Sequence, residues 1–594
     1  VSQPTNRTIQ EMSEWIGLPN GGSSDSPASS AKLSPMTKRG TLLPQSESGK
    51  GGFERQISKI SGAGGASHSY SEEEKEAFSE HINFCLGSDP MLARHMPLDA
   101  MSTDLFDKNA DGLIMCKLIN LAQHDAIDDR ALNTKDSLNV YQKTENQNLA
   151  LNAARAIGCQ VINIGAQDLI EGRPILVLGL VWQVIKIQLL GQISLRNVPE
   201  LVLLLEDDET MVDFLKLHPE IILLRWLNYH LKKAGSSRVV KNFSNDLADS
   251  EVYSLVLHQL DAPKCPLINA SEGAMGKAAK AINNARAMGA EVFLKPKDIC
   301  DGNKKLNTSM VAQLFNTNHG LKVEKSKRLS MVDLSKLSID DAGDSREERV
   351  FRMWINSLNI DEVYINDLFS ECQSGVNLLK VMERVEPGVT EPRRVNLNPK
   401  SRFKEVENGN YVVELGKQMK FSLINVGGLD IVDGNKKLIL AIMWQLMRKY
   451  TLKVLSELAI KQNISDISDE HIVQWANETV AGSGKATKMR SFKDISLKNA
   501  VFLLELVSAI EPRAVNWECV KRDDDKDNHI LNARYAISTA RKVGACVFLT
   551  PEDIVEVKSK MIMTFVSALW MTYLLKRESS SSDSPSEAIA AEKA

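Results

Sequence analysis

Oxygen-bearing side chains in the stretch DKNADGLIMCKL are spaced like those that begin a calcium-binding loop. Asp107, Asn109 and Asp111 would take the first, third and fifth positions of an EF-hand loop, with Gly112 at the sixth, where the chain must turn. The twelfth position requires a bidentate carboxylate, but this chain has Leu118 there, inside an apolar run. We therefore predict no calcium site and interpret Asp111 and Gly112 as the start of a buried helix.

Nucleotide and metal chemistry have weaker support in the sequence. The tetrapeptide GSGK at 482–485 resembles the end of a phosphate-binding loop, but Thr479 stands where the first glycine is required and Ala486 replaces the hydroxyl residue. The ten histidines form no H-E-x-x-H motif, and the eight cysteines form no C-x-x-C motif. No nucleophile and base stand in a recognisable arrangement. These patterns predict a protein that is not an enzyme and holds no metal or cofactor.

The composition narrows the class of protein further. A chain of 594 residues is too long for a single hydrophobic core and predicts several domains. Its formal net charge of -4 provides no basic field that would attract nucleic acid. The most apolar stretch, ILVLGLVW at 175–182, is shorter than the roughly 20 residues of a membrane span, and no secretory signal begins the chain. We expect a cytoplasmic protein that binds neither nucleic acid nor membranes.

Four short signatures recur four times, in the same order, between residues 71 and 577. The first places an aromatic residue in a short amphipathic helix (INFCL, LRWLNYH, RMWINSL, VQWANETV). The second leads a polar pair into an apolar helix (DGLIMCKLI, DSEVYSLVL, SGVNLLKVM, KNAVFLLEL), and the third ends a helix (LNAARAIG, INNARAMG, LGKQMKFS, ISTARKVG). The fourth is an Asp before an apolar residue, ahead of a final helix. The spacing of about 125–135 residues is that of a domain, so the sequence predicts four copies of one helical domain.

The repeats give structural roles to residues that could otherwise suggest sites. Each repeated Asp precedes a helix in a different copy, which favours helix capping over paired carboxylate catalysis. These residues are Asp168, Asp298, Asp430 and Asp553. The Trp residues of the first signature lie among Leu and Ile on amphipathic helices, which predicts core anchors rather than ligand-stacking groups. These residues are Trp226, Trp354 and Trp475.

The last helix of a copy is predicted to be largely buried. Residues 175–189 are apolar on nearly every face, and residues 438–446 repeat this pattern in the third copy. Polar side chains enter late in both helices, so the late turns are predicted to lie at the surface. These side chains are Gln183, Lys186, Gln445, Arg448 and Lys449.

The ends and the middle of the chain have a different composition from the repeats. Residues 1–70 and 578–594 are rich in small and polar residues and are predicted to be disordered, apart from a short helix at TIQEMSEWIG. In the basic segment between the second and third copies, Lys327 and Arg328 precede Ser330 in the way that basophilic kinases prefer. Two interpretations are open: the segment is a solvated connector, or Ser330 is a phosphorylation site whose phosphate would change the charge of this linker.

Much of the repeated region reads like sequence of the fimbrin (plastin) family, which carries four calponin-homology domains in tandem. The resemblance is strongest in REERVFRMWINSLNIDEV, NYVVELGKQMKFSLINV, DIVDGNKKLILAIMWQLMR, PEDIVEVKSKMIMTFVSALW and GRPILVLGLVWQVIKI. It implies an all-α fold in which each domain is a compact bundle of four main helices. The domains are expected at 71–190, 218–320, 344–452 and 466–577, with linkers at 191–217 and 321–343.

The resemblance also implies F-actin as the partner and the actin cytoskeleton as the location. The domains are expected to pair into two actin-binding units, 71–320 and 344–577, so that one chain, acting as a monomer, cross-links filaments into tight bundles. An alternative is a scaffold that binds one filament with one unit and a different partner with the other. Family members commonly carry calcium-binding EF-hands ahead of the bundle, but residues 1–70 contain no acidic loop with a closing Glu, so we expect no calcium control here.

The family's actin contacts lie on the first and last helices of the leading domain of each unit and on the first helix of the trailing domain. In the first unit these are SEEEKEAFSEHINF, ILVLGLVWQVIKIQLL and EIILLRWLNYHLKKAG, and in the second REERVFRMWINSL, KKLILAIMWQLMRKYTL and EHIVQWANETV. We expect a few polar and basic side chains on them to carry the affinity. The candidates are Gln183, Lys186, Lys232, Lys233, Gln445, Arg448 and Lys449.

Overall fold

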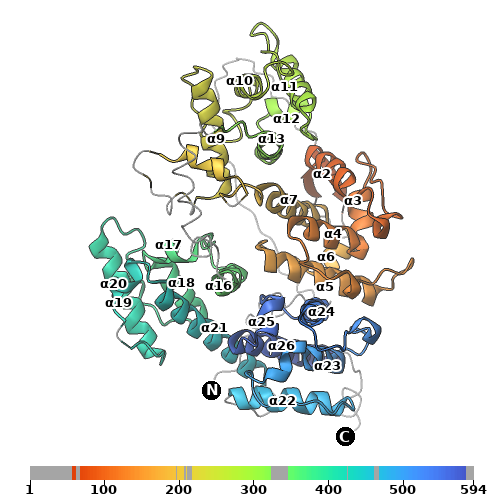
Figure 1. The fold of residues 1–594 in the computed structure, drawn as a ribbon, viewed down its shortest axis with the longest axis vertical. Helices are drawn as coiled ribbons and strands as arrows, with labels where there is room; N and C mark the ends of the chain where they lie inside the picture. The colour runs from red at the N-terminus through yellow and green to blue at the C-terminus, as the bar shows by residue number, and fades with distance from the viewer. Residues whose placement is uncertain are drawn as a thin grey trace, which may run out of the picture.

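Helices grouped in four domains are the main regular secondary structure of the described chain, which confirms the all-α prediction (Figure 1). The computed structural model describes residues 57–61, 67–322 and 346–582, except 196, 207, 208, 210–213, 215, 216, 425 and 460–466. The predicted phosphorylation site, Ser330, lies outside the described residues, as does the short helix expected at TIQEMSEWIG.

A small antiparallel hairpin precedes the first domain. Strand β1 (Ile57–Ser61) pairs with β2 (Ser67–Ser71), so the structure differs here from the disorder predicted for residues 1–70. The reason is local anchoring: Tyr70 is buried and packs edge-on against Phe106 at 5.4 Å between ring centroids. Ser71 then caps the first helix by accepting a hydrogen bond from the backbone N–H of Glu74 at 3.2 Å.

The first two domains each have four main helices. Those of the first domain are α2 (Glu72–Leu86), α4 (Leu113–Ala122), α5 (Val140–Ile157) and α7 (Pro174–Leu190), joined by η1 (Pro90–Leu92), α3 (Asp104–Asp107), η2 (Lys108–Asp111), η3 (Asp129–Ala131) and α6 (Ala166–Ile170). Those of the second are α9 (Pro219–Lys233), α10 (Glu251–Leu260), α11 (Ala274–Met288) and α13 (Lys304–Thr317), with the short α12 (Pro296–Cys300). Helix η4 (Pro199–Leu204) buries Leu201 and Leu204 within the segment expected to be a linker.

The third and fourth domains follow the same plan. The third contains α16 (Arg346–Ser357), α17 (Leu368–Cys372), α18 (Val376–Val385), η6 (Pro392–Arg394), α19 (Arg402–Gln418), α20 (Gly428–Val432) and α21 (Lys436–Ala459). The fourth contains α22 (Asp469–Gly482), η8 (Ile495–Asn499), α23 (Val501–Ile510), η9 (Trp517–Cys519), α24 (Lys526–Lys542), α25 (Pro551–Val555) and α26 (Ser559–Ser582). Helix α26 therefore includes residues 578–582, which the sequence assigned to a disordered tail.

The repeated Asp residues cap one short helix in every domain. Each is the third residue of a five-residue helix, α6, α12, α20 or α25. Each carboxylate accepts a hydrogen bond from the backbone N–H of the residue before its helix, at 2.6–2.9 Å. The capping prediction is confirmed, and the four carboxylates stand in four separate domains.

The calcium-like segment is the entry to a core helix, as predicted. Gly112 has a left-handed backbone with φ of 82°, and α4 begins at the next residue. A Cβ on Gly112 would lie 2.9 Å from the Cβ of Asn146, so this turn accepts only glycine. The Asp111 carboxylate is already occupied, because it bonds Arg94 at 3.0 Å and His95 at 2.8 Å.

Among the Trp residues of the first signature, those of the second and third domains are core anchors, and that of the fourth domain stacks on another Trp. Trp226 and Trp354 are buried, whereas Trp475 is half-buried and stacks on Trp570 with ring centroids 5.1 Å apart. The first domain departs from the pattern. Its buried equivalent is His81, while Phe84, the aromatic residue of INFCL, is 58% exposed, so the core position of the repeat in this domain is His81 and not Phe84.

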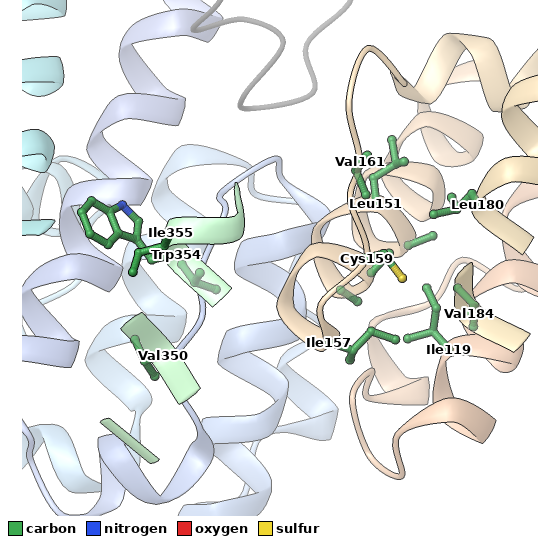
Figure 2. Close-up of a cluster of buried hydrophobic side chains, with 14 of the residues drawn as sticks. Ile119, Leu151, Ile157, Cys159, Val161, Leu180, Val184, Val350, Trp354 and Ile355 are labelled. Carbon is green, nitrogen blue, oxygen red and sulfur yellow. The ribbon is translucent and has the colours of Figure 1, made fainter. Parts of the chain in front are cut away.

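The four domains pack into a closed arrangement in which the first contacts the other three. Helix α7 lies against α13 of the second domain, and α5 lies against both α16 of the third and α24 of the fourth (Figure 1). The Tyr364 hydroxyl donates to the Gly158 carbonyl at 2.8 Å across the contact between the first and third domains. Buried apolar side chains stand on either side of that contact, Ile157 at the end of α5 and Val350 and Trp354 on α16 (Figure 2).

Candidate functional sites

Gln183 on α7 and Gln445 on α21 occupy equivalent positions and make equivalent bonds. The Gln183 amide accepts from the backbone N–H of Gln160 at 2.7 Å and donates to its carbonyl at 3.0 Å. Gln445 likewise accepts from the backbone N–H of Ser422 at 2.6 Å. Each side chain therefore fixes the loop that follows the third main helix of its own domain.

Lys186 and Arg448, one turn later, each form an ion pair with the following domain. The Lys186 Nζ lies 2.7 Å from Glu220 on α9, and an Arg448 nitrogen lies 2.6 Å from Asp469 on α22. Burial alone would raise the pKa of Glu220, but the hydrogen bond and charge of Lys186 outweigh it and hold that pKa below its usual value. Each unit thus contains an equivalent ion pair, which joins the last helix of its leading domain to the first helix of its trailing domain.

The other three candidate cations lie in different surroundings. Lys232 and Lys233 are exposed at the C-terminal end of α9, where positive charge interacts favourably with the helix dipole. Lys233 also lies 4.8 Å from the centre of the Tyr229 ring. Lys449 pairs with Glu386 at 3.1 Å. The structure brings Lys449 together with Gln445 and Arg448 in a groove of about 540 Å³ on α21, whereas Lys232 and Lys233 stand at the far end of α9 from Glu220.

A larger groove of about 900 Å³ lies between the third and fourth domains. It is bounded by α21, α22, the start of α26 and the loop at 488–493. Its apolar lining is Trp444, Val473, Phe492 and Met563, its cations are Arg448, Lys488, Arg490, Lys493 and Lys560, and its carboxylates are Asp469, Glu470 and Glu478. Apolar lining with an excess of cations suits a protein partner with an acidic surface.

The loop at 488–493 is the feature of this groove that sequence reasoning missed. Its sequence, KMRSFK, turns Lys488 and Lys493 to solvent while Met489 and Phe492 are buried. Asn477 on α22 fixes the loop, because its amide bonds the backbone N–H and carbonyl of Met489 at 2.9 Å each. The alternation of basic and apolar residues was the available signal, but only the fold places this loop beside α21.

The first helix of each unit, α2 in 71–320 and α16 in 344–577, is largely covered by other domains. Three carboxylates of α2 form ion pairs with three lysines of the second domain, and only Glu80 and Phe84 on this helix are exposed. The pairs are Glu73–Lys297, Glu74–Lys305 and Glu76–Lys295. No residue of α16 is exposed, and its first turn bonds Glu556 and Lys560 of the fourth domain.

Other chemistry has little support in the part of the chain that the structure describes. There, no group of three or more His, Cys, Asp or Glu side chains could hold a metal ion, and none of the helices has both the length and the apolar character needed to cross a membrane. The GSGK tetrapeptide ends α22 rather than beginning a helix, with Gly484 at φ of 79°. A phosphate-binding loop needs the opposite order, with the helix N-terminus at the phosphate.

Comparisons with known proteins agree with this architecture. The sequence matches the calponin homology (CH) domain over residues 72–189, 217–320, 345–452 and 466–574. It is 43% identical to Fimbrin-3 of Arabidopsis thaliana over 535 residues, which cover 90% of this chain and 74% of the relative. It is 42% identical to Plastin-3 of Homo sapiens over 525 residues, which cover 85% of this chain and 80% of that one. The crystal structure of the actin-crosslinking core of Schizosaccharomyces pombe fimbrin is similar with a TM-score of 0.72 and 38% identity, over 84% of this chain and 100% of that chain.

Proposed function

The chain belongs to the fimbrin (plastin) family of calponin-homology proteins, and from this premise we propose that it binds actin filaments and cross-links them into bundles. The observation that carries the proposal is the similarity to the actin-crosslinking core of a fimbrin, which extends over the whole of that core. The chemistry of the surface is compatible with it, because cations and apolar side chains gather on the helices that the family uses.

Two binding units in one chain are the physical requirement for cross-linking. The units 71–320 and 344–577 repeat the same interdomain ion pair, Lys186–Glu220 in the first and Arg448–Asp469 in the second. Equivalent helices therefore frame equivalent surfaces, α7 with α9 and α21 with α22. Two units whose binding faces point apart can hold two filaments, whereas two units on one filament would raise affinity without bundling.

In the second unit we assign the actin contact to α21, α22 and the loop at 488–493. Lys488 and Lys493 are exposed there and stand beside the apolar lining of the large groove. Lys449 lines the adjoining groove on α21. Because Lys488 and Lys493 are exposed, their attraction for an acidic surface should weaken as salt is added.

In the first unit we assign the contact to the late turns of α7 and to α9. Lys232 and Lys233 are the exposed cations and would contact the filament directly.

Four of the candidate residues would act indirectly, since their bonds are made within the protein. Lys186 and Arg448 would hold two domains at a fixed angle, and Gln183 and Gln445 would fix a loop beside them.

Sedimentation of the full chain with F-actin at low and at high centrifugal speed tests the proposal. The parent should pellet with actin at both speeds, because bundles sediment at low speed and single decorated filaments only at high speed. Reversing two charges in the second unit, Lys488→Glu with Lys493→Glu, should abolish low-speed pelleting and keep high-speed binding through the first unit. The matched control is Lys521→Glu with Arg522→Glu, two exposed cations of the same domain outside the groove, which should behave as the parent.

One observation favours the second candidate function, a scaffold that binds one filament with one unit and another partner with the other. Helix α16, which the family resemblance placed in the second actin contact, is covered by the first and fourth domains. A parent chain that pellets with actin only at high speed, unchanged by the Lys488 and Lys493 reversal, would establish a single competent unit and replace bundling with this function.

The remaining properties follow from the same premise. We propose a monomer that acts in the cytoplasm on the actin cytoskeleton, without catalysis, and that binds neither nucleic acid nor membranes. The net charge of -4 supports the exclusion of nucleic acid, because no global basic field is available.

A further inference from the structure

A polar cavity of about 250 Å³ lies where the first, third and fourth domains meet. The first domain contributes the loop at 123–126 and the end of α5, the third contributes Arg349 from α16, and the fourth contributes α24 and residues 548–552. The proposed actin contacts do not use this cavity, because they lie on α7, α9, α21, α22 and the loop at 488–493.

Arg541 on α24 is a buried cation in this lining, with only 5% of its surface exposed. Its guanidinium donates to the Val547 carbonyl at 2.9 and 3.2 Å and to the Ala126 carbonyl at 3.0 Å. None of the ion pairs among the described residues involves Arg541, and burial lowers its pKa to about 10. A guanidinium has five N–H groups, so these three bonds leave two N–H groups for another acceptor.

Two further polar side chains on α24 line the same cavity. Arg534 and Ser538 share one helix face with Arg541, because the three are spaced by four and then three residues. Arg534 pairs with Asp125 through one terminal nitrogen at 2.7 Å, and its Nε–H is fully buried, so a ligand in the cavity would meet the terminal nitrogens of its guanidinium. Ser538 is 1% exposed and accepts from the Asp128 N–H at 2.9 Å, so its own hydroxyl proton has no acceptor in the described chain.

The buried guanidinium of Arg541 has no carboxylate partner among the described residues. Arg349 adds a third guanidinium, from the wall formed by the third domain. The two lining carboxylates are Asp125, which is engaged by Arg534, and Glu552, which is exposed; His124 is exposed as well. A buried cation without a counter-ion is costly, and an anion that enters the cavity would remove that cost.

We propose that this cavity binds a small phosphate-containing anion, held by Arg541, Arg534 and Ser538, with Arg349 on the opposite wall. Guanidinium groups match phosphate oxygens with two parallel hydrogen bonds, and the Ser538 hydroxyl adds a third donor type. The volume of about 250 Å³ is below the usual range for drug-sized ligands and suits inorganic phosphate, pyrophosphate or a small phosphate ester.

Occupancy of this site ties the two actin-binding units together. The lining comes from three domains, so the bound anion interacts fully only with the closed arrangement. A ligand that binds one arrangement better than another shifts the population toward it. The anion therefore stabilises the contact between α5 and α24, and amides in these helices exchange more slowly with solvent when it is bound.

Calorimetric titration of the full chain with pyrophosphate, at constant ionic strength and without actin, tests the site. The parent should bind one pyrophosphate per chain, and inorganic phosphate should compete for it if a single phosphate group is recognised. Arg534→Gln should weaken binding about tenfold by removing one charge-assisted contact. Ser538→Ala, which leaves every charge in place, should also weaken binding and serves if Arg534→Gln does not fold.

The matched control is Arg522→Gln, which removes an exposed arginine of the fourth domain that does not line the cavity. This variant should bind pyrophosphate as the parent does. Absence of binding by the parent, or unchanged affinity in both Arg534→Gln and Ser538→Ala, would overturn the proposal. Because no actin is present, either result leaves the actin proposal to its own test.

Discussion

An asparagine on the first helix of every domain holds the segment that follows it. Each side-chain amide both donates to and accepts from the backbone of one later residue, at 2.7–3.0 Å. The pairs are Asn83 with Leu98, Asn228 with Val240, Asn356 with Ile365 and Asn477 with Met489. The sequence contains this signal, an Asn two residues after the aromatic position of the repeat. Its role could not be predicted, because an Asn in a helix gives no indication of which distant backbone it bonds.

Replacing Asn356 by Ala should destabilise the third domain by about 2–4 kcal/mol. The change removes two hydrogen bonds and leaves the N–H and carbonyl of Ile365 buried without partners. Thermal unfolding of the full chain should show an earlier first transition. Asn398→Ala, at an exposed position of the same domain, should melt like the parent. Equal melting of Asn356→Ala and the parent would mean that water replaces the lost bonds.

The capping carboxylate of the second domain makes stability depend on pH. Burial is the largest influence on Asp298 and raises its pKa to about 6. The folded state therefore holds this proton more tightly than the unfolded chain, whose Asp titrates near pH 4. Stability from Asp298 is present below about pH 4 and is lost as the pH rises through 6.

Asp298→Asn should abolish that pH dependence. The amide oxygen can still accept from the Lys295 N–H, but no charge needs to be buried at neutral pH. At pH 7 we expect the variant to be about 1–2 kcal/mol more stable than the parent, and below pH 4 we expect no advantage. Unfolding curves at several pH values measure the difference. Glu291→Gln, an exposed carboxylate of the same domain, should show no such pattern, and a gain that is constant with pH would contradict the burial argument.

At the scale of elements, hydrophobic period and capping residues predicted which helices exist but not which of their outer faces are covered. The third signature forms the end of an equivalent helix in three domains with the same arginine. Arg155 on α5 and Arg541 on α24 are buried because these two helices pack on each other, whereas Arg286 on α11 is exposed. One motif thus has two outcomes. Whether the arginine is buried depends on a helix that is distant in the sequence. For example, the Asn152 side chain donates to the Arg541 carbonyl across a sequence separation of 389 residues.

The docking of α2 on the second domain should depend on salt. Lys305 lies 2.6 Å from Glu74, next to two further pairs of the same polarity. Each half-exposed pair contributes about 1 kcal/mol or less, but Lys305→Glu would add repulsion in a row of carboxylates. We expect a lower melting temperature for the first unit at low salt and a smaller loss at high salt. Lys241→Glu reverses an exposed charge in the same domain and is the control, and a loss that did not shrink with salt would point to packing instead.

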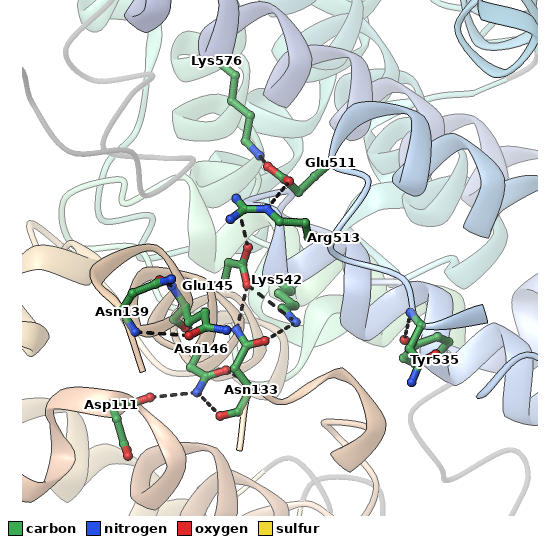
Figure 3. Close-up of polar contacts among 12 residues, drawn as sticks. Asp111, Asn133, Asn139, Glu145, Asn146, Glu511, Arg513, Tyr535, Lys542 and Lys576 are labelled. Atoms are coloured by element: carbon green, nitrogen blue, oxygen red, sulfur yellow. Dashed lines mark hydrogen bonds and ion pairs between the residues drawn. The ribbon is translucent and has the colours of Figure 1, made fainter. Parts of the chain in front are cut away.

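At the scale of the whole molecule, a chain of polar contacts joins the fourth domain to the first (Figure 3). It passes from Lys576 through Glu511 and Arg513 to Glu145 of α5, and from Glu145 through Lys542 to Asn133. Lys542 is only 4% exposed, and burial lowers its pKa. Such residues resemble an ordinary solvated surface in the sequence. The closed arrangement could not be predicted, because it depends on shape and on residues that meet only after all four domains have folded.

Arg130 is the residue whose replacement we expect to open this closed arrangement. It donates to the Cys519 and Leu531 carbonyls of the fourth domain at 2.9 and 2.7 Å, and its guanidinium lies 5.0 Å from the centre of the Tyr535 ring. Replacing it by Ala removes these contacts and leaves Asp128 without its ion pair, which should weaken the contact between the domains by about 2–4 kcal/mol.

Small-angle scattering of the Arg130→Ala chain should therefore give a larger radius of gyration than the parent, while the helix content stays the same. Amides of α5 and α24 should exchange faster, because this contact covers both helices. Arg393→Ala, an exposed arginine of the third domain, should leave both measurements unchanged. If Arg130→Ala scatters like the parent, the apolar and polar contacts that remain between α5 and α24 are sufficient to hold the two units together. The closed form would then depend on the whole interface and not on the contacts of Arg130.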